Sequence, residues 1–186
     1  MGLFAAPTAA VAAQGDSRSS YTLRMKTTLY MAISTDGFIA GEHDETPWSD
    51  DSWQAFKAFI TSCDIVLLGR RTYQIMTAQD EFVDGPEYVV VTHDPSFDTG
   101  SLRKLSIASR NDMPKAEKVG IIGGGELNGR LAELGVIDEI ILDVEPTVLG
   151  SGKRLFGDHK IELNLELMDS RRIGGSTIQN RYKVKS

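Results

Sequence analysis

The stretch Ile121-Ile122-Gly123-Gly124-Gly125-Glu126-Leu127 indicates which class of fold this chain adopts. It joins a short apolar run over 119–122, typical of a buried strand, to a helical pattern over 126–134 that ends at Gly135. Glycines at such a junction let backbone N–H groups approach an anion, and the helix dipole adds to the attraction. Taken alone, the run is equally compatible with a tight strand-to-helix turn.

Two common phosphate-binding motifs are excluded at this point. Asn128 stands where the dinucleotide-binding fingerprint has its final glycine, and the run does not follow an early βαβ unit. A phosphate-binding P-loop is excluded further along, because Arg154 follows Gly152-Lys153 and Thr147 replaces the first glycine. An anion site at the glycine run therefore needs support from another part of the chain.

That support lies upstream, where the apolar run 65–68 stops at Gly69 and Arg70-Arg71-Thr72 follows. Arginines and a hydroxyl beside a helix start suit a phosphate monoester, although a solvated basic turn is the commoner origin of such a sequence. Because the carboxyl ends of strands in an α/β sheet line one crevice, this segment and the glycine run face the same ligand. A pyrophosphate on the glycines and a second phosphate on Arg70 and Thr72 describe NADP rather than NAD.

The whole pattern predicts an α/β fold, with a mostly parallel sheet covered by helices and an antiparallel C-terminal hairpin. The expected elements are strands at 27–33, 65–68, 88–91, 119–122 and 137–144, helices at 47–63 and 126–134, and hairpin strands at 162–168 and 177–184. The first hairpin strand has leucines at 163, 165 and 167, which alternation places on one face. No internal repeat divides the core.

Composition limits the function classes. The 186 residues carry a formal charge of −6 without a cluster of Lys and Arg, which argues against a nucleic-acid partner. One cysteine, Cys63, and three scattered histidines provide neither a disulfide framework nor a zinc-ligand spacing, so no metal is expected. No run approaches the roughly 18 apolar residues of a membrane span. We expect a cytoplasmic protein that acts on a small molecule.

The first 24 residues differ from the rest. They are rich in Ala, Ser and Gly and have no apolar periodicity. We expect a disordered extension over 1–24 and a single domain over 25–186. A secretory signal remains the alternative, because Val11-Ala12-Ala13 resembles a cleavage site, but a basic start is missing and Pro7 interrupts the apolar run.

Together with these segments, several further motifs resemble the dihydrofolate reductase superfamily. The series, in order, is Ser34-Thr35-Asp36-Gly37-Phe38-Ile39-Ala40, Pro47-Trp48, Leu68-Gly69-Arg70-Arg71-Thr72-Tyr73, Val90-Val91-Thr92 and Gly123-Gly124-Gly125-Glu126-Leu127. The segments 131–140 and 146–152 are especially similar to the reductase domain of bacterial riboflavin biosynthesis, the RibD C-terminal branch. The resemblance spans about 25–185 and implies a dihydrofolate-reductase-like three-layer αβα fold.

The resemblance also implies NADPH-dependent hydride transfer. Residues assigned to the cofactor on this basis are Ala32, Ile39, Gly69, Arg70, Arg71, Thr72, Thr92, Gly123, Gly124, Gly125, Glu126 and Leu127. Arg70 and Thr72 are expected at the 2′-phosphate, the glycine run at the pyrophosphate, and Ala32 and Ile39 at the nicotinamide carboxamide. The protein's own share of such chemistry is to position the reactants and exclude water.

The substrate end departs from the family pattern. Both acids in the first turn of the expected helix, Asp50 and Asp51, follow Trp48 too closely to match the acid of a dihydrofolate reductase without a gap. We choose Asp51 as the substrate-polarising acid, with a first-turn dipole residue as the alternative reading. Trp48 and Asp36, in the loop expected to close over the nicotinamide, complete the expected catalytic set.

Three functions remain open. The first is a reductase most like 5-amino-6-(5-phosphoribosylamino)uracil reductase, standing alone because the deaminase zinc signature is absent. The second is a dihydrofolate or pterin reductase, and the third is a non-catalytic NADP-binding module. A pair at the loop after 150–152, Lys153 and Arg154, either holds a substrate phosphate or is solvated. Relatives of this branch are often homodimers, so a homodimer is expected at the family level.

Overall fold

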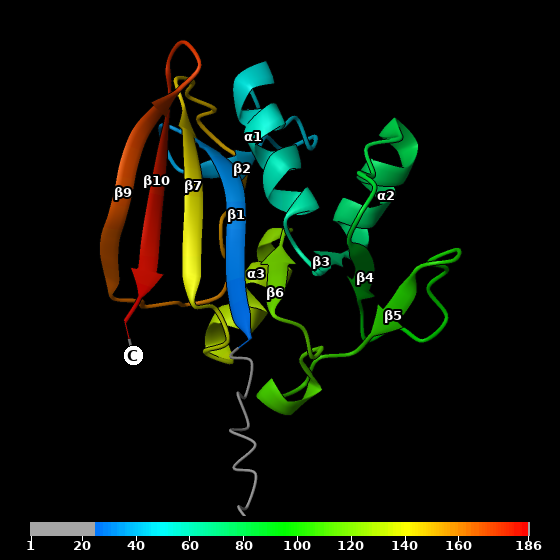
Figure 1. Cartoon of the computed structure of the whole chain (residues 1–186). Coiled ribbons are helices and arrows are strands. Elements are labelled where there is room, and N and C mark those ends of the chain that lie inside the picture. Colours follow the sequence, from blue (N-terminus) through cyan, green and yellow to red (C-terminus); the bar gives the residue numbers. More distant parts are fainter. Residues whose placement is uncertain (1–24, 186) are drawn as a thin grey trace, which may run out of the picture.

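The computed structural model describes residues 25–185. The predictions made for residues 1–24 lie outside this range. Within it, eight strands form one sheet in the order β5-β4-β3-β6-β1-β7-β10-β9, and β2 pairs with β8 in a small second sheet (Figure 1). The strands from β5 to β7 run parallel, whereas β10 is antiparallel to both β7 and β9. The α/β class, the mostly parallel sheet and the antiparallel hairpin are therefore confirmed.

The helices and strands have the following bounds. The strands are β1 Lys26–Ser34, β2 Phe38–Ala40, β3 Ile65–Gly69, β4 Glu87–Val91, β5 Arg103–Leu105, β6 Lys118–Ile121, β7 Glu139–Glu145, β8 Lys153–Arg154, β9 Leu165–Ile173 and β10 Thr177–Val184. The helices are α1 Asp50–Thr61, α2 Arg70–Gln79, α3 Gly125–Glu133 and a 3₁₀ turn, η1, at Arg110–Asp112.

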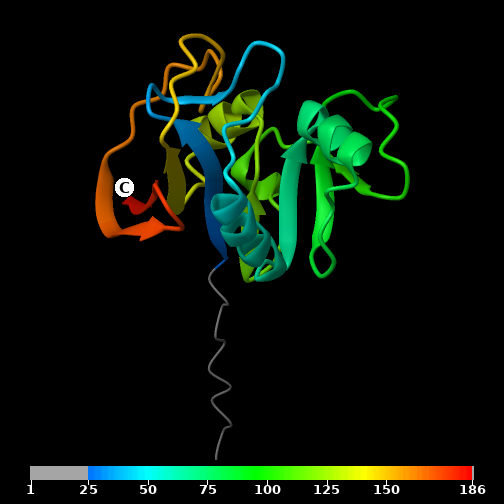
Figure 2. The ribbon, with the colours of Figure 1, turned by 90° about the horizontal axis from the view of Figure 1, so that it is seen from above.

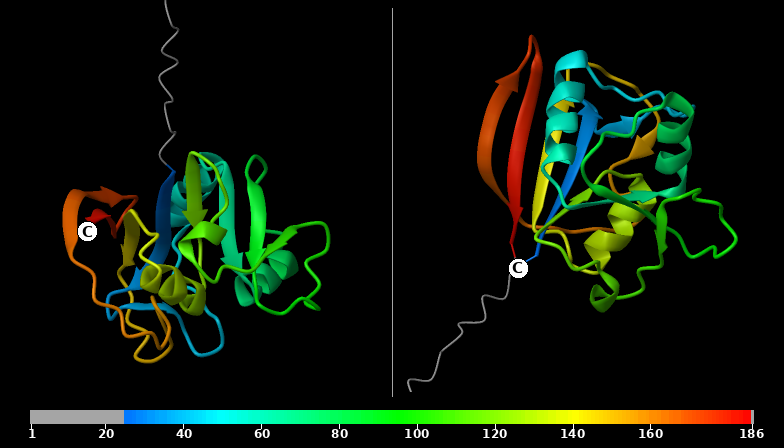
Figure 3. Two further views of the ribbon diagram at one scale, coloured as in Figure 1. Left: turned by 90° about the horizontal axis from the view of Figure 1, so that it is seen from below. Right: turned by 45° about the vertical axis from the view of Figure 1, so that its right-hand side comes forward.

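Two apolar clusters hold three layers together. One cluster packs Phe56 and Ile60 of α1 and Met76 of α2 against one face of the sheet. The other packs Leu127 and Leu131 of α3 against the opposite face, so that α1 and α3 lie on opposite sides of β1 (Figures 1 and 2). The hairpin β9–β10 forms one edge and β5 the other (Figure 3). The apolar, β-leaning runs found in the sequence form the central strands, since these are buried on both faces.

The helix expected over 47–63 begins later than its periodicity suggested. Ser49 is its N-cap and forms a capping box with Ser52, so the helix starts at Asp50. Pro47 and Trp48 therefore belong to the preceding segment, and Trp48 packs against Phe56 with 4.7 Å between ring centroids. The apolar spacing continued into this segment because Trp48 packs against the same apolar cluster that Phe56 and Ile60 of α1 join.

The first strand of the hairpin differs most from its prediction. It runs over Leu165–Ile173 rather than 162–168, because hydrogen bonding to β10 carries it through a polar half that propensity does not favour. Leu165 and Leu167 pair with Val184 and Tyr182 on one face, as expected. These leucines are nevertheless 40% and 57% exposed, since no further layer covers this edge in the described chain.

Two features are absent from residues 25–185. No helix in this range is long and apolar enough to cross a membrane. Likewise, the described side chains contain no group of three or more His, Cys, Asp or Glu that could hold a metal ion.

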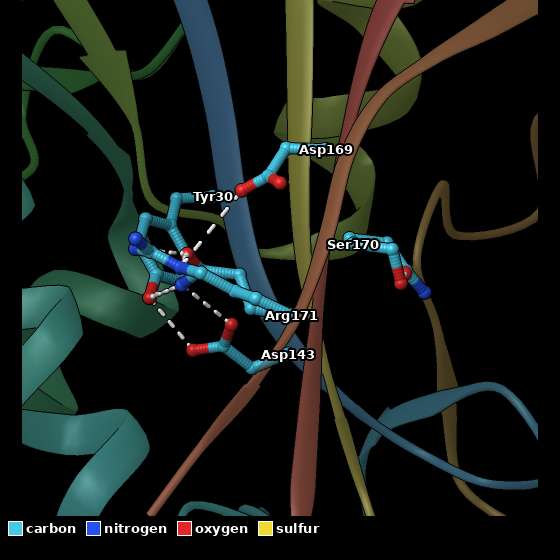
Figure 4. A network of polar contacts seen from close by, with 7 residues as sticks. Tyr30, Asp143, Asp169, Ser170 and Arg171 are labelled. Carbon is cyan, nitrogen blue, oxygen red and sulfur yellow. Dashed lines mark hydrogen bonds and ion pairs between the residues drawn. The ribbon is translucent and has the colours of Figure 1, made fainter.

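A buried polar network ties the first strand to the C-terminal hairpin (Figure 4). The hydroxyl of Tyr30 donates to Oδ2 of Asp143 at 2.7 Å, and the amide of Gln179 donates to the tyrosine oxygen and to the other carboxylate oxygen. Arg171 of β9 donates to Gln179 Oε1. Burial raises the pKa of Asp143 to about 6, with Glu145 adding to the effect, although Tyr30 and Gln179 partly oppose it by hydrogen bonding.

We predict that Asp143 makes the protein less stable as pH rises from about 4 to about 6. Its pKa is higher in the folded than in the unfolded chain, so folding favours the protonated form and this contribution is lost as the carboxyl ionises. Urea unfolding of the wild type and of Asp143→Asn across pH 4 to 8 measures how this contribution to the free energy of unfolding changes with pH. The wild type should lose stability relative to the variant as pH rises, and a pH-independent difference would contradict the assignment.

Candidate functional site

A cleft of about 1010 Å³ lies at the carboxyl ends of the parallel strands. Its walls come from the starts of α2 and α3, the ends of β4 and β6, and the segment between β2 and α1. That segment and the loop carrying β8 lie side by side at the same end of the molecule (Figure 2). Segments distant in sequence therefore meet around one cavity, as expected for a parallel sheet.

Two of the helix starts that border this cleft, those of α2 and α3, have no capping side chain in the part of the chain that the structure describes. Helix α1 is capped by the side chain of Ser49. By contrast, α2 and α3 begin after Gly69 and Gly124, and among the described residues neither N-cap makes a side-chain hydrogen bond. First-turn N–H groups without a capping side chain attract anions, and the dipoles of both helices reinforce this. Two such termini at one cleft suit a ligand with separate phosphates.

The three glycines between β6 and α3 have different structural roles. Gly123 has a φ of +101°, and its carbonyl oxygen accepts a hydrogen bond from the Gly69 amide at 2.8 Å. A Cβ on Gly124 would meet, within the described chain, only Thr72 Oγ1 at 3.8 Å, so space remains on the cleft side. A Cβ on Gly125 would lie 2.5 Å from the carbonyl oxygen of Arg154. Gly125 therefore permits close packing, whereas Gly124 leaves room for a ligand.

The start of α2 presents an accessible arginine. Arg70 lies 3.4 Å from Asp94 and 5.5 Å from the ring centroid of Phe97, and both charged side chains are substantially exposed. Such an exposed pair is weak, so Arg70 can exchange this partner for a phosphate at little cost. Thr72 also lines the cleft, as does Thr92, whose hydroxyl accepts a hydrogen bond from the Asp94 amide.

Its neighbour Arg71 is engaged differently. The guanidinium donates through Nε and Nη2 to Oδ2 of Asp44, with 2.8 Å for the Nε contact. Lys153 of β8 approaches the second carboxylate oxygen at 3.3 Å and donates to the carbonyl oxygen of Glu42. Burial alone would raise the pKa of Asp44, but the hydrogen bonds and charges of Arg71 and Lys153 outweigh it and lower that pKa.

The opposite wall is aromatic. Trp48, Trp53 and Phe56 all line the cleft and lie within 4.7–5.9 Å of one another by ring centroids. Tyr30 packs behind them, with its ring 5.4 Å from that of Phe56. Asp50, at the start of α1, lines the cleft beside this wall. The combination of flat apolar surface and one acid is suited to a planar ring that carries polar atoms.

Two expected catalytic acids lie outside the cleft. The carboxylate of Asp51 faces the hairpin turn, where a Cβ on Gly174 would collide with it. One residue along a helix rotates a side chain by about 100°, so Asp50 rather than Asp51 faces the cavity. Asp36 accepts hydrogen bonds from Ser34 and from the Gly150 amide, which hold its pKa below the ordinary value. Asp36 thus fixes the turn after β1 to the loop before β8.

The remaining expected residues fall into two groups. Those that line the cleft are Trp48, Ile39, Gly69, Arg70, Arg71, Thr72, Thr92, Gly124, Gly125, Glu126 and Leu127. Ala32 and Gly123 lie outside the lining. Ala32 is 1% exposed. It lies two residues after Tyr30 on β1, so strand alternation places its side chain on the face of the sheet that α1 covers.

Sequence reasoning missed Glu145, a buried acid behind the aromatic wall. It is 1% exposed, and its carboxylate accepts hydrogen bonds from the amide and hydroxyl of Ser49 and from the hydroxyl of Thr177 at 2.6 Å. The available signal was an acid directly after the predicted strand 137–144, where the observed strand β7 still continues. Asp44 was also missed, because it lies in an irregular segment without periodicity.

Comparison with known proteins places the chain in a family. The RibD C-terminal domain family matches residues 102–178. The uncharacterized protein YwjB of Bacillus subtilis is 30% identical over 172 residues, which cover 86% of this chain and 98% of that protein. This chain belongs to the RibD C-terminal domain family. A second uncharacterized protein of the same organism, YyaP, is 25% identical over 173 residues, covering 83% of this chain and 92% of its own length.

Solved structures of low sequence identity share the fold. A putative riboflavin biosynthesis protein from Shewanella has a TM-score of 0.68 at 20% identity, covering 87% of this chain and 100% of its own. A pyrimidine reductase-like protein from Corynebacterium diphtheriae gives 0.71 at 13%, with 87% and 92% covered. Dihydrofolate reductase from Enterococcus faecalis, complexed with NADP(H) and RAB-propyl, gives 0.63 at 16%, with 87% and 97% covered. The dihydrofolate-reductase-like fold is thereby confirmed.

The different roles of Gly124 and Gly125 generate a paired prediction. Gly125→Ala should lower stability by roughly 1–3 kcal/mol, because the added methyl group is forced against backbone. Gly124→Ala should leave the thermal midpoint nearly unchanged, yet weaken binding of a phosphate-bearing nucleotide at least tenfold. Thermal unfolding and nucleotide titration of both variants provide the measurement. A stable Gly125→Ala, or a Gly124→Ala that binds normally, would remove the distinction.

Proposed function

We propose that this protein is an NADPH-dependent reductase of a small heterocyclic metabolite. The observation that carries the proposal is the pair of helix starts, α2 and α3, which open without capping side chains onto one cleft. Arg70 and Thr72 at one start, and the free space at Gly124 at the other, suit the 2′-phosphate and the pyrophosphate of a dinucleotide phosphate. Membership of the RibD C-terminal domain family supports the same activity.

We assign the cofactor to the residues that line the cleft. Arg70 and Thr72 would hold the 2′-phosphate, with Thr92 beside the adenosine. The backbone of Gly124 and of the first turn of α3 would hold the pyrophosphate, and Ile39 would contact the nicotinamide. When bound, NADPH supplies the hydride. Arg71 is left out of the phosphate set, because Asp44 already engages its guanidinium.

The acceptor would lie on the aromatic wall. Trp48 and Trp53 provide flat apolar surface that orients a ring and excludes water. Asp50 is the acid beside that wall, so we propose it as the group that polarises the ring or delivers a proton. A pyrimidine ring like that of the riboflavin-biosynthesis intermediate is the favoured acceptor, and a pterin is the alternative.

A non-catalytic NADP-binding module is the competing function. Such a module has no need of an acceptor site, whereas here a cavity wall of three aromatic rings and an acid continues beyond the proposed cofactor contacts. That wall favours the enzyme. NADPH binding without turnover of any pyrimidine or pterin acceptor would favour the module instead.

The cofactor assignment predicts a preference for NADPH over NADH. Quenching of Trp48 and Trp53 fluorescence should show NADPH binding at least tenfold tighter, a difference of about 1.4 kcal/mol. Arg70→Ala should abolish this preference, because only NADPH carries the phosphate that Arg70 would bind.

Arg103→Ala is the matched control for this titration. Arg103 is also exposed and paired with an acid, Glu87, but lies on β5 outside the cleft. Its removal should leave both affinities unchanged. Absence of binding by either nucleotide at micromolar concentration would refute the reductase proposal.

We also propose that the protein forms a homodimer through β9. This strand is an edge of the sheet, and Leu167 and Met168 on it are 57% and 55% exposed. Its acids, Glu166 and Asp169, precede Arg171 and Arg172, so antiparallel pairing with a second copy brings opposite charges together.

Leu167→Lys should therefore convert the dimer to a monomer in sedimentation velocity, since it places a charge in the proposed contact. Val148→Lys is the control, because Val148 is an exposed apolar residue outside the hairpin. A monomeric wild type, or an unaffected Leu167→Lys dimer, would exclude this interface.

A further inference from the structure

Asp44 holds two cations in the lining of the cleft, where the segment after β2 meets β8. Its side chain is only 15% exposed, whereas its partners Arg71 and Lys153 are 65% and 46% exposed. The carboxylate thus lies beneath two basic side chains that line the same cavity. The three residues come from the segment before α1, from the first turn of α2 and from β8.

This cluster is better protected than the other ion pair at the helix start. Arg70 and Asp94 are both exposed and 3.4 Å apart, so their attraction is weak. Asp44 instead accepts two hydrogen bonds from Arg71 and also forms an ion pair with Lys153. Lys153 is also anchored by the carbonyl oxygen of Glu42. A ligand phosphate would have to replace a shielded carboxylate, which also repels it.

The other basic side chains that line the cleft are also paired with carboxylates. In the described chain, four lysine or arginine side chains line it, and each has a carboxylate partner: Arg70 with Asp94, Arg71 and Lys153 with Asp44, and Arg130 with Glu133. The loose pair, Arg70 with Asp94, lies where the cofactor phosphate is proposed. The tight cluster includes Lys153, which pairs in the small sheet with Ala40, next to Ile39, the residue assigned to the nicotinamide. An acceptor has to approach the nicotinamide, so this cluster lies on the acceptor's side of the proposed cofactor site.

We propose that Asp44 is a specificity-determining residue that, by occupying Arg71 and Lys153, selects an acceptor without a phosphate group. The inference rests on the proposed reductase function and narrows its acceptor to a pyrimidine or pterin without a phosphate, which excludes 5-amino-6-(5-phosphoribosylamino)uracil itself. A phosphate-bearing acceptor would meet two neutralised cations and the carboxylates of Asp44 and Asp50. An uncharged planar ring would meet the apolar surfaces of Trp48 and Trp53.

Uridine and uridine 5′-monophosphate are suitable probes, because they differ by one phosphate on the same ring and sugar. Each is titrated into the protein saturated with NADPH, with tryptophan fluorescence as the readout. The wild type should bind the nucleoside at least as tightly as the monophosphate. Asp44→Asn should bind the monophosphate at least tenfold more tightly than the wild type does, with uridine affinity changed less than twofold.

Glu42→Gln is the matched control, because it removes one negative charge from the same segment at an exposed side chain. It should leave both affinities unchanged. Lys153→Met in the Asp44→Asn background should abolish the gained monophosphate binding, which separates release of this cation from a general loss of negative charge. Circular dichroism at each stage shows that the variants are folded.

Two results would overturn the inference. One is a wild type that prefers the monophosphate tenfold. The other is a folded Asp44→Asn protein, or a folded Asp44→Ala protein if the first variant misfolds, that gains no affinity for it. Either result leaves the cofactor assignment intact, whereas failure of NADPH to bind in the preceding saturation step refutes the reductase proposal itself. The two proposals therefore fail by different measurements.

Discussion

The hydrogen bond from the Gly69 amide to the Gly123 carbonyl oxygen fixes the geometry of the cleft. It joins the ends of β3 and β6, which are neighbours in the sheet. Each of these strands is followed at this point by a helix, α2 or α3. Because both turns occur at glycine N-caps, both helices begin without a capping side chain. The proposed phosphate sites, the position of Arg70 and the open space at Gly124 all follow from this junction.

Much of the fold was predictable because local signals and tertiary environment agree. Strands buried on both faces appear as continuous apolar runs, and Gly69 and Gly123 mark the ends of two of them. The gathering of most of the expected cofactor residues around one cleft followed for the same reason, since strand ends in a parallel sheet converge. The acid of α1 that faces the cleft was not predicted. One residue of helix rotation separates Asp50 from Asp51, and the position of the helix start depended on Ser49.

The residues that sequence reasoning missed interact across long stretches of chain. Asp44 is paired with Arg71 and Lys153, and no local pattern brings those positions together. The edge strand β9 was placed too early, because its second half is held by pairing with β10 rather than by apolar alternation. Such features depend on tertiary contacts that composition and periodicity do not encode.

Glu145 couples the order of synthesis to completion of the cavity. Its carboxylate joins Ser49, which caps α1, to Thr177 at the start of the last strand. The aromatic wall is carried by α1 and the segment before it, so its anchoring requires a residue 128 positions after Ser49. On a ribosome, the glycines that end β3 and precede α3 would emerge before that anchor. The aromatic wall would therefore be anchored later than the glycine turns on the other side of the cleft are made.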